Sequence, residues 1–160
     1  MYYKIIETPI GKLTLICDDI SLTSIAFGEK QMSEEFEEKQ LHPILVETSR
    51  QLSLFFEGKL QEFNIPLNPS GTTFQKAVWD SLKEIPYGKT VSYGDVAKNI
   101  GNPKSVRAVG QANNKNPIPI IIPCHRVVGK DGSLVGYGGG LDIKKYLLAL
   151  EDSTDKGVAL

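Results

Sequence analysis

The sequence predicts an α/β protein of the α+β type, with an antiparallel sheet in its first half and mostly helices in its second. Near the N-terminus, three short runs rich in Ile, Leu, Thr and Tyr alternate with turn residues, as in an antiparallel meander. Later segments carry apolar residues at helical intervals. The turn-rich stretch 68–71 separates the two patterns and predicts two domains, 1–70 and 71–160.

The composition is that of a folded protein. With 160 residues, 41% of them apolar, the chain is long enough to bury a hydrophobic core. No apolar run has the length of a membrane span and the N-terminus lacks a signal-like apolar segment, so we expect a cytoplasmic protein with no membrane partner. Cys17 and Cys124 do not suggest a disulfide framework, and with His42 and His125 they form no zinc-type spacing. We therefore predict no metal site.

Charge is distributed unevenly along the chain. Residues 1–70 hold 6 Lys/Arg and 11 Asp/Glu, a net charge of −5, whereas residues 71–160 hold 12 and 8, a net charge of +4. A basic half suits a polyanion such as nucleic acid, and the acidic half would then face away from it. Chance unevenness is the alternative for charges of this size.

The first half can be divided into elements from its patterns. The expected strands are residues 2–8, 12–17 and 22–27. Cys17 would be a small core residue or a quiet surface residue in the second strand. The charged stretch 29–41 is expected to be a solvated loop or an exposed helix, and His42 a surface residue. Apolar spacing predicts an amphipathic helix over 44–57, and residues 63–67 a short edge strand.

The second half begins and ends with an expected helix. Thr72 or Thr73 would cap the first of these helices, and the stretch 86–89 would end it. Its apolar face carries Phe74, Val78, Leu82 and Ile85, with Trp79 beside them. The last helix, 142–151, is expected to turn Ile143, Tyr146, Leu147 and Leu150 inward. The tail, 152–160, is expected to be frayed.

Residues 92–112 resemble a helix-turn-helix. A helix over 93–100, capped by Ser92, is followed by a glycine turn. Asn102 would cap the second helix, about 103–112, because asparagine is a favoured cap and proline a favoured first helical residue. Short helix pairs with a glycine turn also occur in proteins that bind no DNA.

The second helix of this pair mixes basic and small side chains. The basic residues are Lys104 and Arg107, and the small ones are Ser105, Ala108, Gly110 and Ala112. A face of small residues can approach a DNA groove closely, and an arginine can reach into the duplex. This mixture favours DNA binding over a purely structural helix pair.

The stretch 120–128 carries the strongest chemical signal. An apolar run leads through Pro123 to Cys124, His125 and Arg126, and a second apolar pair follows, so the flanks look buried and strand-like. Beside a base and a permanent cation, a cysteine at a proline-marked bend would gain thiolate character and is a candidate nucleophile. From adjacency alone a buried structural cysteine is the simpler interpretation, because sequence neighbours need not face each other.

Three turns or loops surround this stretch. Residues 113–117 predict a polar turn before it, and residues 129–132 a hairpin turn after it. The glycine-rich stretch 136–140 predicts a mobile loop with free backbone amides. All three would lie close to the cysteine in sequence.

Ordered motifs in the second half resemble those of the methylated-DNA–protein-cysteine methyltransferases, the O6-alkylguanine-DNA alkyltransferases. They are Ser92-Tyr93-Gly94, Gly101-Asn102-Pro103, Arg107-Ala108-Val109-Gly110, Asn116-Pro117 and Ile122-Pro123-Cys124-His125-Arg126-Val127. The match covers roughly residues 72–151 with family-like spacing, which is more specific than any single motif. The first half fits the family's three-stranded, ribonuclease-H-like domain in pattern only.

The resemblance implies direct repair of double-stranded DNA that contains O6-alkylguanine, with O4-alkylthymine as a candidate second substrate. The family flips the damaged nucleotide out through the minor groove and moves the alkyl group onto the cysteine in a single turnover. The resemblance also implies a protein without a cofactor that acts as a monomer, or as several copies along the DNA.

The resemblance assigns roles to individual residues. The catalytic residues it implies are Cys124, His125, Glu151, Tyr93 and Asn116. Cys124 would be the nucleophile, and His125, oriented by Glu151, would take its proton through a water. Tyr93 would donate to the ring nitrogen of the leaving guanine, and Asn116 would brace the turn behind the cysteine. Arg126 would be a structural ion-pair partner.

The remaining implied residues contact substrate or DNA. The substrate-binding residues are Tyr93, Val127, Gly138, Pro119 and Tyr137. The amide of Gly138 would bond O6, and the carbonyls of Cys124 and Val127 would accept from the guanine amino group. The DNA-binding residues are Arg107, Lys104, Ser105, Ala108, Gly110 and Ser92. Arg107 would fill the gap left by the flipped nucleotide.

Some positions depart from the family pattern. They are Ser105 and Val106 in place of smaller residues, Gln111 in place of a glycine, Asn114-Lys115 without the frequent arginine, and Gly138 in place of serine or alanine. These departures concern DNA affinity and the size of alkyl group tolerated. Two other functions stay open at this point: a non-catalytic binder of DNA lesions, and a Cys-His hydrolase or redox protein acting on small molecules.

Overall fold

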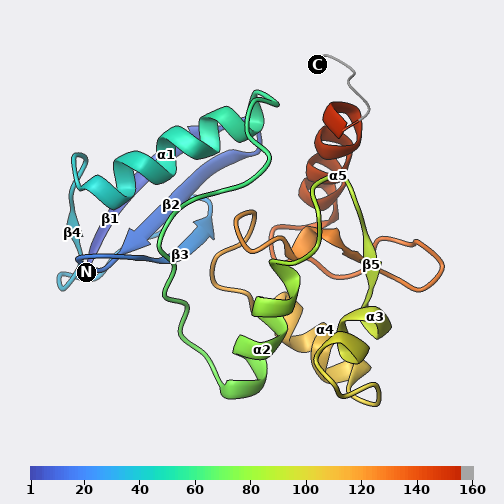
Figure 1. The fold of residues 1–160 in the computed structure, drawn as a ribbon. Helices are drawn as coiled ribbons and strands as arrows, with labels where there is room; N and C mark the ends of the chain where they lie inside the picture. Colours follow the sequence, from blue (N-terminus) through green and yellow to red (C-terminus); the bar gives the residue numbers. More distant parts are fainter. Residues whose placement is uncertain (156–160) are drawn as a thin grey trace. The chain divides into compact units, whose positions relative to one another are not determined.

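The computed structural model of the chain describes residues 1–155 and confirms the α+β class (Figure 1). Two compact units meet in the sequence between Ser70 and Gly71. The first contains a sheet and one helix. The second contains mostly helices, with one short two-stranded pairing.

The three predicted strands of the first unit are confirmed. They are β1 (Tyr2–Thr8), β2 (Gly11–Cys17) and β3 (Leu22–Phe27), paired antiparallel. A two-residue strand, β4 (Glu37–Glu38), adds parallel to β1, so the sheet has four strands in the order β3-β2-β1-β4 rather than three. Its backbone contacts, such as Glu37 N–H to Met1 O at 3.0 Å, need no apolar side chains. The charged stretch 29–41 therefore lacks the apolar alternation from which a strand could be predicted.

Helix α1 (Pro43–Phe56) packs against the sheet, as its apolar spacing predicts. The buried side chains of this unit include Leu13, Leu15, Cys17, Leu22, Leu45, Leu52 and Phe55. Residues 63–67 do not form an edge strand. Only a single bridge, Leu22 to Leu67, joins this stretch to the sheet.

His42 is not a surface residue, contrary to the sequence-based expectation. Its side chain caps α1, where Nδ1 accepts a hydrogen bond from Ile44 N–H at 3.1 Å, and only 6% of the residue is exposed. The ring also packs on Tyr2, with centroids 5.0 Å apart. Cys17 lies in the core, with its Sγ 3.6 Å from the same Nδ1. A histidine before proline can thus cap a helix from a buried position.

The second unit contains four α-helices among its described residues. They are α2 (Thr73–Leu82), α3 (Tyr93–Asn99), α4 (Val106–Asn114) and α5 (Leu141–Asp155). A single turn of 3-10 helix, η1 (Cys124–Arg126), leads into β6 (Val127–Val128), which pairs parallel with β5 (Val91–Ser92).

Helix α2 begins with a capping box that Thr72 forms with Gln75. The Thr72 hydroxyl accepts from Gln75 N–H at 3.1 Å, and the Gln75 side chain accepts from Thr72 N–H at 2.9 Å. The helix ends at Leu82, earlier than the predicted stop at 86–89. Trp79 is buried, and its Nε1–H donates to the carbonyl of Ala112 at 2.9 Å, which ties α2 to α4.

The helix-turn-helix prediction holds for α3 but not for the start of the next helix. Ser92 caps α3 as expected, whereas α4 begins at Val106 instead of about residue 103. Ser105 directs both its N–H and its hydroxyl to the carbonyl of Asn102, so residues 102–105 close a separate turn. At its other end α4 runs through Asn114 and takes in part of the predicted polar turn.

The last helix, α5, is longer than predicted and turns a different face inward. Leu147 and Leu150 are buried as expected, but Tyr146 is 39% exposed and the fully buried residue of the first turn is Lys144. The helix continues to Asp155, so residues 152–155 are not frayed, and the rest of the predicted tail lies outside the described residues. Within residues 1–155, no helix is both long and apolar enough to cross a membrane.

The capping box gives a stability prediction. Thr72→Ala removes the acceptor for Gln75 N–H at the start of α2 and should lower the free energy of unfolding by about 1 kcal/mol. Chemical denaturation measures this. The matched control is Thr73→Ala, one residue further along, where the side chain makes no capping bond. Equal losses in the two variants would contradict the capping role.

Candidate active site

Cys124 begins the 3-10 turn η1 and is only 4% exposed. Two asparagines hold the backbone around it. Asn113 Nδ2 donates to the carbonyl of Cys124 at 3.3 Å, and Asn116 Nδ2 donates to the carbonyl of Ile122 at 2.8 Å. Asn116 Oδ1 also accepts from Ile118 N–H at 3.0 Å, so this one side chain closes the loop before the cysteine.

That loop is a tight turn rather than the strand expected from its apolar composition. Ile120 has a φ of 75°, a left-handed conformation that costs a β-branched residue free energy. Its side chain is 1% exposed, so burial fixes the loop in this shape. The nucleophile candidate therefore sits on a backbone that packing and Asn116 hold in a strained conformation.

The thiol of Cys124 is not pre-ionised in this structure. Burial raises its pKa to about 11, although hydrogen bonds from Asn116 and Tyr137 and the charge of Lys144 act in the opposite direction. The expectation that its neighbours in sequence favour thiolate is therefore wrong. His125 and Arg126 both direct their side chains to Glu151 instead. At neutral pH the cysteine needs a base to become a nucleophile.

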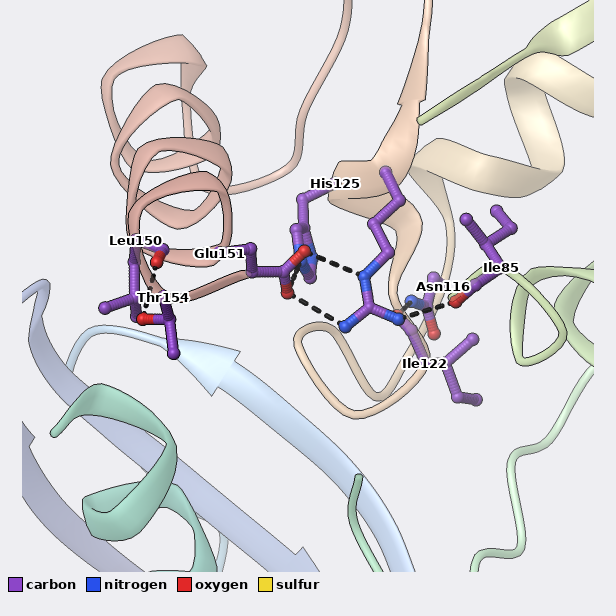
Figure 2. Close-up of polar contacts among 8 residues, drawn as sticks. Ile85, Asn116, Ile122, His125, Leu150, Glu151 and Thr154 are labelled. Atoms are coloured by element: carbon purple, nitrogen blue, oxygen red, sulfur yellow. Dashed lines mark hydrogen bonds and ion pairs between the residues drawn. The ribbon is translucent and has the colours of Figure 1, made fainter. Parts of the chain in front are cut away.

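Glu151 lies beside His125 (Figure 2) and forms one buried cluster with His125 and Arg126. Glu151 Oε2 lies 2.7 Å from His125 Nε2, and the Arg126 guanidinium donates to both carboxylate oxygens at 2.9 Å. The remaining Arg126 nitrogen donates to the carbonyl of Ile85 at 2.7 Å. The structural ion pair expected for Arg126 is present.

The cluster fixes the charge state of each member. Burial alone would raise the pKa of Glu151, but the hydrogen bonds from His125 and Arg126 outweigh it and hold this pKa at about 2. Burial lowers the pKa of His125, and the charges of Arg126 and Lys144 lower it further against the opposing effect of Glu151. At neutral pH, therefore, a neutral imidazole faces an ionised carboxylate.

This arrangement selects one histidine tautomer. The ring nitrogen next to an ionised carboxylate holds the proton, so Nε2 is the donor and Nδ1 carries the lone pair. His125 Nδ1 is buried and has no hydrogen-bond partner among residues 1–155. A neutral, oriented imidazole with a free lone pair is a general base.

Two tyrosines complete the surroundings of the thiol. The hydroxyl of Tyr93 donates to the carbonyl of Val135 at 2.9 Å. Burial raises its pKa, and the nearby Cys124 raises it further. Burial also raises the pKa of Tyr137, whose hydroxyl hydrogen-bonds with Cys124. Both phenols thus stay protonated at neutral pH and act as donors.

The structure brings the predicted catalytic residues together but leaves some of the predicted substrate contacts occupied. The carbonyl of Val127 accepts from Lys144 Nζ at 2.6 Å. The carbonyl of Cys124 accepts from Asn113 and from Val127 N–H. Pro119 lies in the strained loop. At Gly138, an added Cβ would meet nothing closer than the Asn114 carbonyl at 3.8 Å, so there is room for a larger ligand or side chain.

The predicted DNA-binding residues gather at the start of α4. Lys104, Arg107 and Ala108 are exposed, and Ser105 and Gly110 are half-buried. Ser92 is engaged locally, because its hydroxyl accepts from Asp95 N–H at 3.0 Å to cap α3. A groove of about 690 Å³ runs beside these residues, lined by α3, the start of α4 and the turn at 128–132.

Comparison with known proteins covers both units. Residues 73–153 match the family model described as "6-O-methylguanine DNA methyltransferase, DNA binding domain". Residues 1–69 match the model of the ribonuclease-like domain of the same family. A methylated-DNA–protein-cysteine methyltransferase of Methanosarcina acetivorans is 53% identical over 96% of this chain and 99% of its own length. The chain belongs to this family.

Other members of the methylated-DNA–protein-cysteine methyltransferase family are similar to this chain over most of its length. The Haemophilus influenzae enzyme is 44% identical over 94% of this chain and 86% of its own length. The crystal structure of Mycobacterium tuberculosis OGT in complex with DNA has a TM-score of 0.90 and 44% identity, covering 96% of this chain and 94% of that one. The family, fold and enzyme class predicted from the sequence are thereby confirmed.

Sequence reasoning missed two residues of the site, Asn113 and Lys144. Asn113 was assigned to a polar turn, although its place on α4 directs it to the cysteine carbonyl. Lys144 has no counterpart among the predicted site residues, and lysines are rarely buried. The helical spacing of Lys144, Leu147 and Glu151 places the three residues on one face of α5, and this spacing could have indicated that Lys144 is buried with them. In residues 1–155, no three His, Cys, Asp or Glu side chains are grouped closely enough to hold a metal ion.

The Glu151 cluster predicts a pH dependence of stability. The folded pKa of Glu151, about 2, lies below its usual 4.5, so its ionisation stabilises the fold above about pH 4.5 and this stabilisation is lost as pH falls through about 2. Glu151→Gln should lower the free energy of unfolding by roughly 3 kcal/mol at pH 7. The difference from the unaltered protein should shrink in acid.

The control for this prediction is Glu47→Gln. Arg50 also holds the pKa of Glu47 at about 2, but that pair is exposed, so its loss should matter far less. Denaturation at several pH values provides the measurement. A Glu151→Gln penalty that stayed constant from neutral to strongly acidic pH would argue against an ionised, buried Glu151.

Proposed function

We propose that this protein repairs O6-alkylguanine in double-stranded DNA by moving the alkyl group irreversibly onto Cys124. Family membership supplies the reaction class. The observation that carries the residue assignment is the cluster of His125 with Glu151, which prepares a neutral base on the residue that follows a buried, protonated thiol. O4-alkylthymine is the candidate second substrate for the same chemistry.

The first step in this proposal is proton transfer. The thiol proton of Cys124 passes through a water to His125 Nδ1, while the Nε2–H of His125 stays bonded to Glu151. The resulting imidazolium is stabilised by the ionised carboxylate. Because the thiol pKa is about 11, thiolate forms only as the reaction proceeds, and the resting protein is protected from other electrophiles.

The second step is displacement at the alkyl carbon. The Cys124 sulfur forms a bond to this carbon while the bond from carbon to O6 breaks, and the electron pair leaves with the guanine. Tyr93 donates its proton to the ring nitrogen. To do so, the Tyr93 hydroxyl breaks its hydrogen bond to the carbonyl of Val135 and donates to the guanine instead. The product is a thioether, which is not a leaving group at neutral pH, so each molecule acts once.

Binding of the duplex is assigned to the start of α4 and the adjoining groove. Arg107 is exposed on the first turn of α4, where it can enter the minor groove and fill the space of the flipped nucleotide. Lys104, Ser105, Ala108 and Gly110 lie nearby, so the backbone can approach the DNA. We place this activity in the cytoplasm and expect a monomer, or several copies along one DNA.

Intact-protein mass spectrometry after mixing with an O6-methylguanine duplex tests the function. We expect the mass of one methyl group per protein, located in the peptide that contains Cys124. Cys124→Ala should remove transfer completely and keep DNA binding, whereas Cys17→Ala, which removes the other buried thiol, should keep both. DNA binding without any transfer in the unaltered protein would favour a lesion binder, and the absence of both would favour small-molecule cysteine chemistry.

Arg107→Ala tests the flipping role. Without the side chain that replaces the extruded nucleotide, part of the unstacking cost, which is a few kcal/mol, is no longer offset. Repair of the duplex should therefore slow by about tenfold to a hundredfold. Reaction with the free base O6-methylguanine should be nearly unchanged, because nothing is flipped. Lys104→Ala is the control, since loss of a phosphate contact weakens DNA binding without a separate effect on flipping. Equal slowing of Arg107→Ala on duplex and free base would remove this role.

A further inference from the structure

Lys144 is a buried cation that the mechanism above does not use. Its side chain is 0% exposed, and Nζ donates to the carbonyls of Val127 at 2.6 Å, Val135 at 2.9 Å and Gly136 at 3.3 Å. No carboxylate in residues 1–155 forms an ion pair with it. Burying an ammonium group is costly unless its charge is compensated. The three carbonyl dipoles compensate it only in part.

The three carbonyls belong to the segments that frame the thiol. Val127 follows the turn that begins with Cys124, and Val135 and Gly136 lead directly to Tyr137, which hydrogen-bonds with the thiol. The Val135 carbonyl is shared, because it accepts from Lys144 and from the hydroxyl of Tyr93. Lys144 therefore fixes the segment that positions both tyrosines.

Lys144 also lies close enough to the reacting groups for its charge to act on them. Its ammonium group is 6.0 Å from the centre of the Tyr93 ring. Tyr93 is the residue that meets the departing base in the proposed reaction. The other charged or titratable groups of this region are Cys124, His125, Arg126, Tyr137 and Glu151. Burial lowers the pKa of Lys144, whereas the charge of Cys124 raises it. Of the two basic side chains, Arg126 and Lys144, only Arg126 is matched by a carboxylate.

We propose that Lys144 is a positioning residue for alkyl transfer, and that its unmatched positive charge stabilises the negative charge that forms on the Cys124 sulfur and then passes to the departing guanine. The inference rests on the proposed function. Lys144 holds the 135–137 segment through hydrogen bonds and acts on the sulfur through its charge. It need not touch the substrate for either effect.

The chemistry gives a reason for a fixed cation at this place. Ionisation of the thiol creates a negative charge in a buried site, and displacement then moves that charge to the base. A cation held in place lowers the free energy of both states without reorganisation. Consistently, the charge of Lys144 lowers the pKa of Cys124 against the effect of burial.

The charge and the hydrogen bonds of Lys144 can be separated by substitution. Lys144→Gln keeps two N–H donors for the three carbonyls but removes the charge, whereas Lys144→Met removes both the donors and the charge. Lys145→Met is the matched control, because Lys145 is the next residue on the same helix and is exposed. It removes an equal charge from the surface.

Thiol labelling without DNA measures the charge effect. Each variant is treated with iodoacetamide over a range of alkaline pH, and the labelled peptides are quantified by mass spectrometry. In Lys144→Gln, the pH profile of Cys124 labelling should move to higher pH, with labelling about tenfold slower at a fixed pH below the midpoint. Buried Cys17 in the first unit is the internal reference and should not change, nor should Cys124 in Lys145→Met.

Methyl transfer from an O6-methylguanine duplex measures the effect on the reaction. Lys144→Gln should be slower by about tenfold to a hundredfold at unchanged DNA affinity, and Lys144→Met slower still. Absence of transfer in the unaltered protein would overturn the proposed function itself. Transfer in the unaltered protein, with labelling profiles and rates the same in Lys144→Gln, would overturn only the role of Lys144. Failure of both variants to fold would assign Lys144 to the fold and overturn that role as well.

Discussion

The buried carboxylate of Glu151 is the interaction on which the second unit and its chemistry depend. It accepts hydrogen bonds from His125 and Arg126, and Arg126 continues to the carbonyl of Ile85. One side chain of α5 thus joins the turn that carries the nucleophile to the segment that follows α2. Removing a charge from water is costly, and several charge-assisted hydrogen bonds are needed to offset that cost. Either partner alone would leave part of the carboxylate unsatisfied.

Glu151 has two partners with different roles: Arg126 anchors the carboxylate, and His125 is the base that the carboxylate orients. Arg126 donates to both oxygens of the carboxylate and so holds it in place whether or not His125 carries an extra proton. His125 can therefore gain and lose a proton at Nδ1 without disturbing the bond that orients its ring. The strained turn at Ile120, closed by Asn116, holds the nucleophile with the same rigidity. A base and a nucleophile on rigid supports need little reorganisation during reaction.

Local patterns in the sequence predicted the main elements, and long-range contacts account for what they missed. Strand alternation and helix caps such as Ser92 and Thr72 are encoded within a few residues. The start of α4 was misplaced because Asn102–Pro103 has the residues of a helix start, yet the chain first closes a turn. The pairing of Glu151 with Arg126 and His125 was visible only by resemblance, because it joins residues 25 and 26 positions apart.

The raised pKa of Cys124 shows why adjacency is a poor guide to reactivity. His125 and Arg126 follow the cysteine in sequence, but a 3-10 turn sends their side chains to Glu151, and the positive charge that acts on the sulfur comes from Lys144 on another element. With Arg126 and Glu151 cancelling each other, the site retains the charge of Lys144. That remaining positive charge has the sign required to stabilise a thiolate and then a guanine anion. The electrostatics of the site therefore follow from the fold of α5 against the cysteine turn, not from the residues next to the cysteine.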